Sequence, residues 1–300
     1  MKRLPLIVFL PLAVALAFAQ KIELLQEPNA PPMPKGPSAL QLYCGGFIEH
    51  RNLPRDKYII GAADSPHATR YGRNDTVYLA GKGYQVGERY LVVREVHDPN
   101  HQEMWPHQGR RLASLGHLYQ ELGFLVITHV GDHATISSFT FPCDTAVPGD
   151  FLIPFEPREI LYFRTDDTGF REFDYKTKGP RGEIVLGKEF DSMLGRGSIA
   201  YINLGSKQGL KPGDYLIVTR SYSPRDMIPV DTVSLHAKTR EDTQTNAPSV
   251  STRNLDNMPR RGIGEVMVTN VTPDTATVII IKSLAEIQLG DSVQLEVPQQ

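Results

Sequence analysis

Short apolar runs separated by Gly, Pro and Asp recur along most of this chain. One run ends at Leu204 and another covers residues 215–218, and the connection between them contains Gly209, Pro212 and Gly213. Glycine adopts backbone conformations that other residues resist, and proline restricts φ. The pattern therefore predicts two strands joined by a structured turn.

The same pattern occurs earlier, because V-Y-L-A-G-K-G-Y-Q-V-G-E-R-Y-L-V-V-R at 77–94 resembles Y-I-N-L-G-S-K-Q-G-L-K-P-G-D-Y-L-I-V-T-R at 201–220. The matched positions are Gly83 with Gly209, Gly87 with Gly213, Glu88 with Asp214, and Arg94 with Arg220. Three later blocks match in the same order: 123–128 with 264–269, 134–136 with 276–278, and 149–152 with 290–293. The last block aligns Gly149 and Asp150 with Gly290 and Asp291. This repetition indicates an internal duplication, with these Gly and Asp residues at structural turns.

Each repeat offers five or six short strands with turn residues between them, a pattern typical of a small closed sheet. We expect an all-β protein made of two tandem small antiparallel β-barrels with short helical insertions. The first barrel should cover residues 40–155, a linker 156–181 and the second barrel 182–298. One helix is predicted where leucines recur near helical spacing, although Gly116 weakens it. These leucines are Leu112, Leu115, Leu118 and Leu122.

The N-terminus has the features of a secretory signal. Lys2 and Arg3 precede an apolar run over 4–16, and residues 17–19 have a small-x-small pattern. A membrane anchor is the alternative, but the run is shorter than the ~20 residues that a spanning helix needs. We expect a signal peptide over 1–19, a proline-rich spacer over 20–39, and an exported protein with no integral membrane segment after cleavage, in the periplasm or at the outer envelope.

Export changes the interpretation of Cys44 and Cys143, the two cysteines of the chain. An oxidising compartment favours a disulfide between them. The alternative is two buried thiols that behave as small apolar side chains. Two cysteines alone do not make a zinc site.

Charge argues against nucleic-acid partners. The chain has 32 Lys+Arg and 34 Asp+Glu, a formal net charge of −2. There is no basic stripe with interleaved aromatic residues, so nucleic-acid binding is not expected.

Candidate chemistry is sparse. His97, His101 and His107 share one loop, but no helical spacing forces them to converge on a metal. Ser114 lies in L-A-S-L-G, which lacks the first glycine of a nucleophile elbow. Gly81-Lys82-Gly83 lacks the spacing of a phosphate-binding loop. We therefore expect no catalytic residues, no cofactor and no metal.

Binding residues are expected in the polar loops. Trp105 and His107 lie in a loop over 97–111, and a second polar insertion covers 221–261 in the same slot of the other repeat. A tryptophan there can stack on a sugar or anchor a protein partner. Alternatively the Trp105 indole packs against a barrel end. The alternative for the two insertions is that their position in the repeat tolerates extra residues without a binding role.

The motif N-x-G-S-x-x-G-L-K-x-G-D-x-L-x-V-x-R at 203–220 is followed by G-E-V-x-V, A-T-V and I-x-x-G-D-x-V. This series resembles the C-terminal barrel domain of flagellar assembly protein T. It is also similar to duplicated domains of exported proteins of Gram-negative bacteria, some of which carry LysM peptidoglycan-binding modules. The resemblance covers most of 44–297, and this chain has no LysM-like segment.

The resemblance implies a non-enzymatic envelope protein that scaffolds an assembly or contacts the cell wall. We therefore expect a scaffold or binding module with an envelope protein as partner. The alternative is a protein that binds peptidoglycan or another polysaccharide. A third hypothesis is a hydrolase whose site is assembled from scattered residues.

Overall fold

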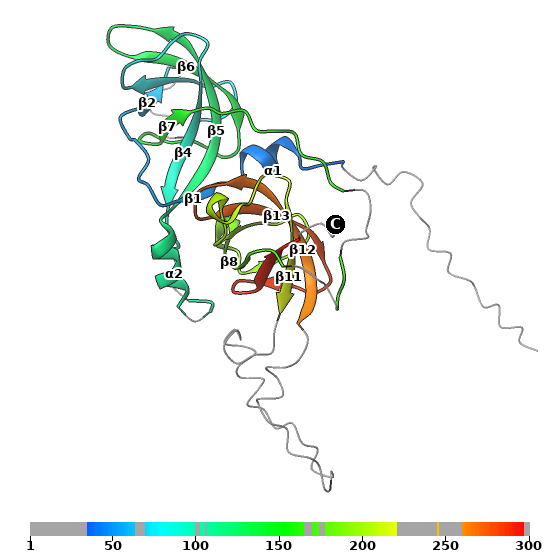
Figure 1. Ribbon diagram of the computed structural model, residues 1–300. Helices are drawn as coiled ribbons and strands as arrows, with labels where there is room; N and C mark the ends of the chain where they lie inside the picture. The colour runs from blue at the N-terminus through cyan, green and yellow to red at the C-terminus, as the bar shows by residue number, and fades with distance from the viewer. Residues whose placement is uncertain are drawn as a thin grey trace, which may run out of the picture. The chain divides into compact units, whose positions relative to one another are not determined.

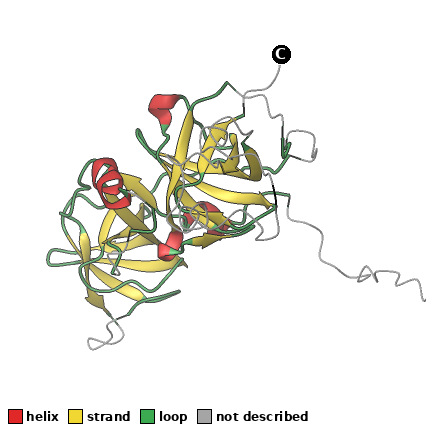
Figure 2. Ribbon diagram, turned by 90° about the horizontal axis from the view of Figure 1, so that it is seen from below, coloured by secondary structure: helices red, strands yellow, loops and turns green. Residues whose placement is uncertain are grey.

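The computed structural model describes residues 35–63, 70–99, 103–105, 107–164, 170–173, 178–220, 245 and 260–296. The expected signal peptide, the spacer up to residue 34 and the second insertion from 221 to 259, except residue 245, lie outside the described residues. Strands make up most of the regular secondary structure of the described part, and its helices are few and short (Figure 2).

The first barrel contains six antiparallel strands in the closed order β5-β4-β7-β2-β3-β6 (Figure 1). A seventh strand, β1, pairs with β5 outside this ring. The elements are α1 (Ala39–Tyr43), β1 (Phe47–Glu49), β2 (Tyr58–Ala62), β3 (Thr76–Ala80), β4 (Arg89–Val96), α2 (Gln108–Leu115), β5 (His117–Val130), β6 (Thr135–Pro142) and β7 (Phe151–Pro154).

The second barrel is closed by six strands in the order β12-β11-β15-β8-β10-β13. Its elements are β8 (Arg181–Gly187), η1 (Lys188–Phe190), β9 (Met193–Leu194), β10 (Ile199–Ile202), η2 (Ser206–Gln208), β11 (Tyr215–Arg220), β12 (Arg261–Val271), β13 (Ala276–Ser283), β14 (Ile287–Gln288) and β15 (Ser292–Leu295). Matching β4 to β11 and β5 to β12 makes the two cyclic orders identical. The prediction of two antiparallel barrels is confirmed.

Among the described residues, three tight turns in each barrel share one design. In every turn the third residue has φ between 68° and 93°. The N–H of the first residue donates to the side chain of the fourth at 2.7–3.2 Å. The N–H of the third residue donates to a strand carbonyl at 2.8–2.9 Å. These are features of a type II turn, which needs a positive φ at its third position. The turns are 72–75, 85–88 and 147–150 in the first barrel, and 195–198, 211–214 and 288–291 in the second.

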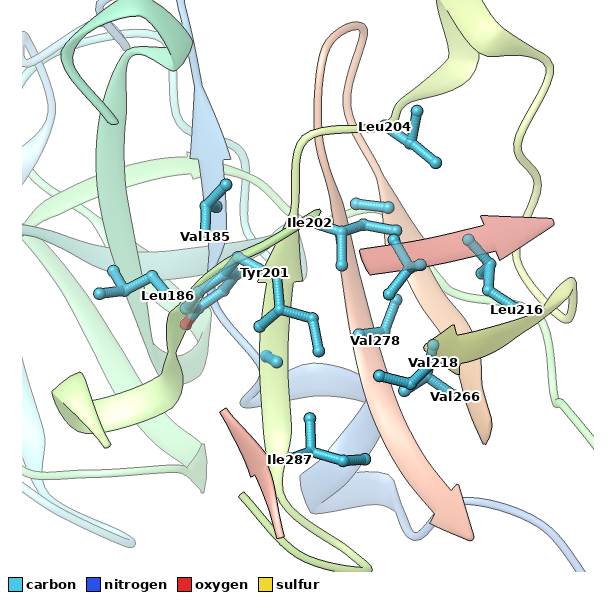
Figure 3. Close-up of a cluster of buried hydrophobic side chains, with 14 of the residues drawn as sticks. Val185, Leu186, Tyr201, Ile202, Leu204, Leu216, Val218, Val266, Val278 and Ile287 are labelled. Carbon is cyan, nitrogen blue, oxygen red and sulfur yellow. The ribbon is translucent and has the colours of Figure 1, made fainter. Parts of the chain in front are cut away.

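Large aliphatic side chains fill both barrels. In the second barrel Ile202 of β10 points toward Val278 and the interior, whereas its neighbour Tyr201 points to the opposite side of the strand (Figure 3). This alternation is the period of a β-strand. It places Tyr201 on the outside of the barrel, where it contributes to the junction described below.

The predicted helix over the leucines is wrong beyond residue 115. Helix α2 ends at Leu115, and Leu118 and Leu122 lie in β5. Gly116 has a φ of 113°, and a Cβ there would lie 2.3 Å from the carbonyl oxygen of Glu49. Positive φ ends the helix at this position. Among the residues that the structure describes, no helix has both the length and the apolar character of a membrane span.

Candidate functional site

Residues 44–46 lie where the two barrels meet, within the unit Lys35–Gln300. The predicted disulfide is confirmed: Cys44 is bonded to Cys143, with 5.4 Å between the Cα atoms. Cys143 directly follows β6, so the bond fastens residues 44–46 to the first barrel.

Buried side chains of the second barrel donate to this segment from the other side. The Tyr201 hydroxyl donates to the Gly45 carbonyl at 2.8 Å, and the Thr277 hydroxyl donates to the Gly46 carbonyl at 2.7 Å. Gly46 has a φ of 71°, and a Cβ there would lie 2.7 Å from the Tyr201 hydroxyl oxygen. Only glycine fits such a close approach. Residues 44–46 therefore join the two barrels through covalent and hydrogen bonds.

Glu121 provides the charged centre of this junction. Its side chain is buried, accepts from the Gly46 N–H at 3.0 Å, and forms an ion pair with Arg158. Burial raises the pKa of the Glu121 carboxyl, while Arg158 and the Gly46 N–H act in the opposite direction. Burial likewise raises the pKa of Tyr201, so its hydroxyl remains a hydrogen-bond donor.

The linker contacts both barrels through two arginines. Arg158 pairs with Glu121 of the first barrel, whereas Arg164 pairs with Glu265 and Glu296 of the second. The Arg164 guanidinium also lies 4.4 Å from the ring centroid of Tyr215. Between the two arginines, Leu161 is buried against the second barrel. This part of the linker is therefore packed against the protein.

A cavity of about 200 Å³ opens beside residues 44–46. Its walls come from the ends of β4 and β5, from η1, and from the Tyr201 ring. Two consecutive wall residues, Glu189 and Phe190, have φ of 59° and 64°. Positive φ is strained for non-glycine residues, most of all for bulky ones, and such strain is concentrated at ligand-binding sites. The cavity is therefore the candidate small-molecule site.

Trp105 is buried, with 6% of its surface exposed, and its ring packs with residues of the second barrel. Helix α2 holds it there, because Gln108 donates to the Val185 carbonyl at 3.2 Å and Arg111 lies 3.3 Å from Glu183. This placement matches the alternative in which the indole packs against a barrel. His107 is exposed and precedes α2 with a φ of 69°.

The glycines and aspartates singled out in the sequence lie in the barrel turns. Gly87, Gly149, Gly213 and Gly290 take the third position, and Asp150, Asp214 and Asp291 the fourth. Gly83 and Gly209 also have positive φ, of 81° and 86°. None of these residues lines the cavity. They support the barrels that position the junction.

His101 lies outside the described residues. In the ranges that the structure does describe, no group of three His, Cys, Asp or Glu side chains is placed to hold a metal ion.

Sequence reasoning missed Gly45, Gly46, Glu121 and Tyr201. Two signals were present: a Gly-Gly pair directly after a cysteine, and a single acidic residue within an apolar stretch of β5. Buried acids are almost always paired, so Glu121 called for a basic partner.

Comparison with protein-family models and with curated proteins finds no match for this chain.

Proposed function

We propose that this protein is an exported, non-catalytic scaffold of the cell envelope that holds a protein partner on one apolar face. The observation that carries the proposal is the exposure of Leu40, Ile160 and Tyr162, at 55%, 75% and 69%. Large exposed apolar groups that cluster on one surface are characteristic of protein contacts.

Two segments form this face, residues 35–43 and residues 158–163, which lie side by side (Figure 1). The Phe163 N–H donates to the Lys35 carbonyl at 2.7 Å, and the Arg158 N–H donates to the Tyr43 hydroxyl at 3.0 Å. We call these two segments the paired segments. Because they are bonded at both ends, the two segments present their exposed side chains from adjacent stretches of chain.

The paired segments are also anchored to the second barrel by buried side chains. Leu42 and Leu161 are buried together against Met267 and Ile279 of the second barrel. A pre-ordered apolar surface loses little conformational entropy when a partner binds. The resemblance to the C-terminal barrel domain of flagellar assembly protein T supports a scaffolding role.

Site-specific photocrosslinking in cells that naturally produce the protein tests this proposal. A photoreactive amino acid replaces Tyr162, and the matched control carries it at Val86, which is exposed to a similar degree, 66%, but lies in a turn of the first barrel. We expect one discrete crosslinked protein from position 162 and none from position 86. Equal crosslinking from both positions, or none from either, would refute the proposal.

A second candidate function, binding of peptidoglycan or another polysaccharide, is favoured by an aromatic cluster that adjoins the paired segments through Tyr43, whose ring lies 5.5 Å from that of Phe155. Phe124 and Phe141 stack at 4.9 Å, and Phe155 lies 4.7 Å from Phe124. These rings are half-buried, and the exposed Arg89 lies 6.0 Å from the Phe155 centroid. Aromatic faces beside a cation suit a sugar chain that carries carboxylates.

Sedimentation with purified cell-wall sacculi tests this second function. Phe155→Ala should reduce pelleting, whereas Tyr58→Ala, which removes an exposed ring elsewhere on the first barrel, should not. Pelleting without crosslinking from position 162 would favour this function over the scaffold. If the wild-type protein stays in the supernatant, the polysaccharide function is refuted.

A further inference from the structure

We infer that the cavity at the junction binds a small aromatic carboxylate, a molecule the size of benzoate. This site is separate from the paired segments and does not depend on the proposed scaffold role.

The size of the cavity suits a ligand of about one ring. Its volume is about 200 Å³. An apolar cavity of about 150 Å³ in a protein interior accommodates benzene. A six-membered ring with one small substituent therefore fits.

The apolar residues that line the cavity favour a ligand with an apolar ring. Val96 and Leu118 contribute from the first barrel, and Phe190 and the Tyr201 ring from the second. Gly45 and Gly46 have no side chains, which leaves this space open. The Tyr201 hydroxyl is already bonded to the Gly45 carbonyl, so it does not require a polar ligand.

Lys188 provides the charge that selects a carboxylate. It lines the cavity with a side chain that is 31% exposed, and its ammonium lies 3.3 Å from a Glu189 carboxylate that is 71% exposed. Glu189 is well screened by water, so this pairing is weak. The other nearby acid, Glu121, is already paired with Arg158. Among the residues that line the cavity Lys188 is the cation, and a ligand carboxylate can bind its ammonium in place of the exposed Glu189 carboxylate.

Positive φ at Glu189 and Phe190 supports a ligand-binding site here, because strained residues cluster at such sites. This conformation is unfavourable for non-glycine residues, and here two consecutive residues adopt it. The surrounding structure holds Glu189 and Phe190 in this conformation, and the same segment presents Lys188 and Phe190 to the cavity.

Titration of the isotope-labelled full chain with benzoate, followed by NMR, tests the inference. We expect saturable shifts of the Gly46 and Phe190 amides. Val96→Phe fills the cavity and should abolish them. Lys188→Met should weaken binding about tenfold or more, because a hydrogen bond to a charged group is lost. Lys211→Met, which removes an exposed lysine from a turn of the second barrel, should have no effect.

Two outcomes overturn the inference. One is the absence of saturable shifts at these amides in the wild-type protein, or shifts that persist in Val96→Phe. The other is equal affinity for benzyl alcohol, which has a similar size and no charge, because Lys188 would then play no part in selection.

Discussion

The guanidinium group of Arg94 donates to both carboxylate oxygens of Asp150, at 2.8 and 2.7 Å. Arg220 makes the same pair of bonds to Asp291 in the second barrel, again at 2.8 and 2.7 Å. Each aspartate also accepts the N–H that closes its own turn. In the first barrel this ion pair joins β4 to the turn that precedes β7. In the second barrel it joins β11 to the turn that precedes β15.

Asp150→Asn should lower the free energy of unfolding by about 2–3 kcal/mol, because the carboxylate is buried and the charged bidentate bond is lost. Chemical denaturation measures this change. The matched control is Asp214→Asn, since Asp214 closes a turn of the same type at 2.8 Å but has no arginine partner among the described residues. The control should lose about 1 kcal/mol or less. Equal losses in the two variants would show that the ion pair contributes nothing beyond the turn.

Cys44→Ser should destabilise the protein under oxidising conditions. The bond closes a loop between residues 99 apart, for which the chain-entropy model gives an upper value of ~4–5 kcal/mol. Thermal unfolding with and without reductant measures the effect. Reductant should lower the melting temperature of the wild-type protein and leave that of the variant unchanged. An identical melting curve for variant and wild type under oxidising conditions would contradict a stabilising bond.

Gly213→Ala should cost about 1–2 kcal/mol, because residue 213 has a φ of 90°. A Cβ at this position would make only ordinary contact with Leu161, at 3.6 Å, so the loss would report backbone strain. Gly195→Ala is the control, since a Cβ at residue 195 would have no other atom within 4 Å and the φ of this residue is not positive. Denaturant titration should show no loss for the control.

Glu121 should give the stability a distinctive dependence on pH. Its folded-state pKa is raised by burial, so the folded protein binds the proton more tightly than the unfolded chain does. The contribution of Glu121 to stability is therefore largest at low pH. It declines as pH rises from the unfolded value of about 4.3 to the folded pKa. Above the folded pKa it is constant.

Unfolding free energies of wild type and Glu121→Gln across this range measure that contribution. The variant should be most destabilised relative to wild type at low pH and less so as pH rises. A destabilisation that instead grows with pH would mean that Arg158 lowers the pKa of Glu121 below its unfolded value.

The sequence predicted the barrels because their turns repeat, and it missed the turns whose residues differ. In turns 147–150 and 288–291 the letters P-G-D and L-G-D align directly. The turns at 72–75 and 195–198 have the same geometry, but Asn74 replaces the glycine and Ser198 the aspartate. Asparagine tolerates positive φ and a serine hydroxyl can accept the same hydrogen bond, so the geometry is retained without the letters.

The junction could not be predicted from periodicity. Tyr201 and Gly45 are 156 residues apart, and Gly46 and Thr277 are 231 residues apart. Local patterns carry no information about such pairs. Trp105 shows the same limit, because its loop is polar in sequence while helix α2 packs the ring against the second barrel.

Residues 44–46 have a consequence for the order of folding. Chains emerge from the ribosome with the N-terminus first, and domains generally fold as units in that order. Every strand of the first barrel precedes residue 155, whereas the carbonyl oxygens of Gly46 and Ile48 accept hydroxyls of Thr277 and Thr275 from the end of the chain. The carbonyl groups of this early segment therefore stay hydrated until the strand that carries Thr277 has been made. We therefore expect docking of the two barrels to complete folding, and to be slow because it joins residues far apart in the sequence.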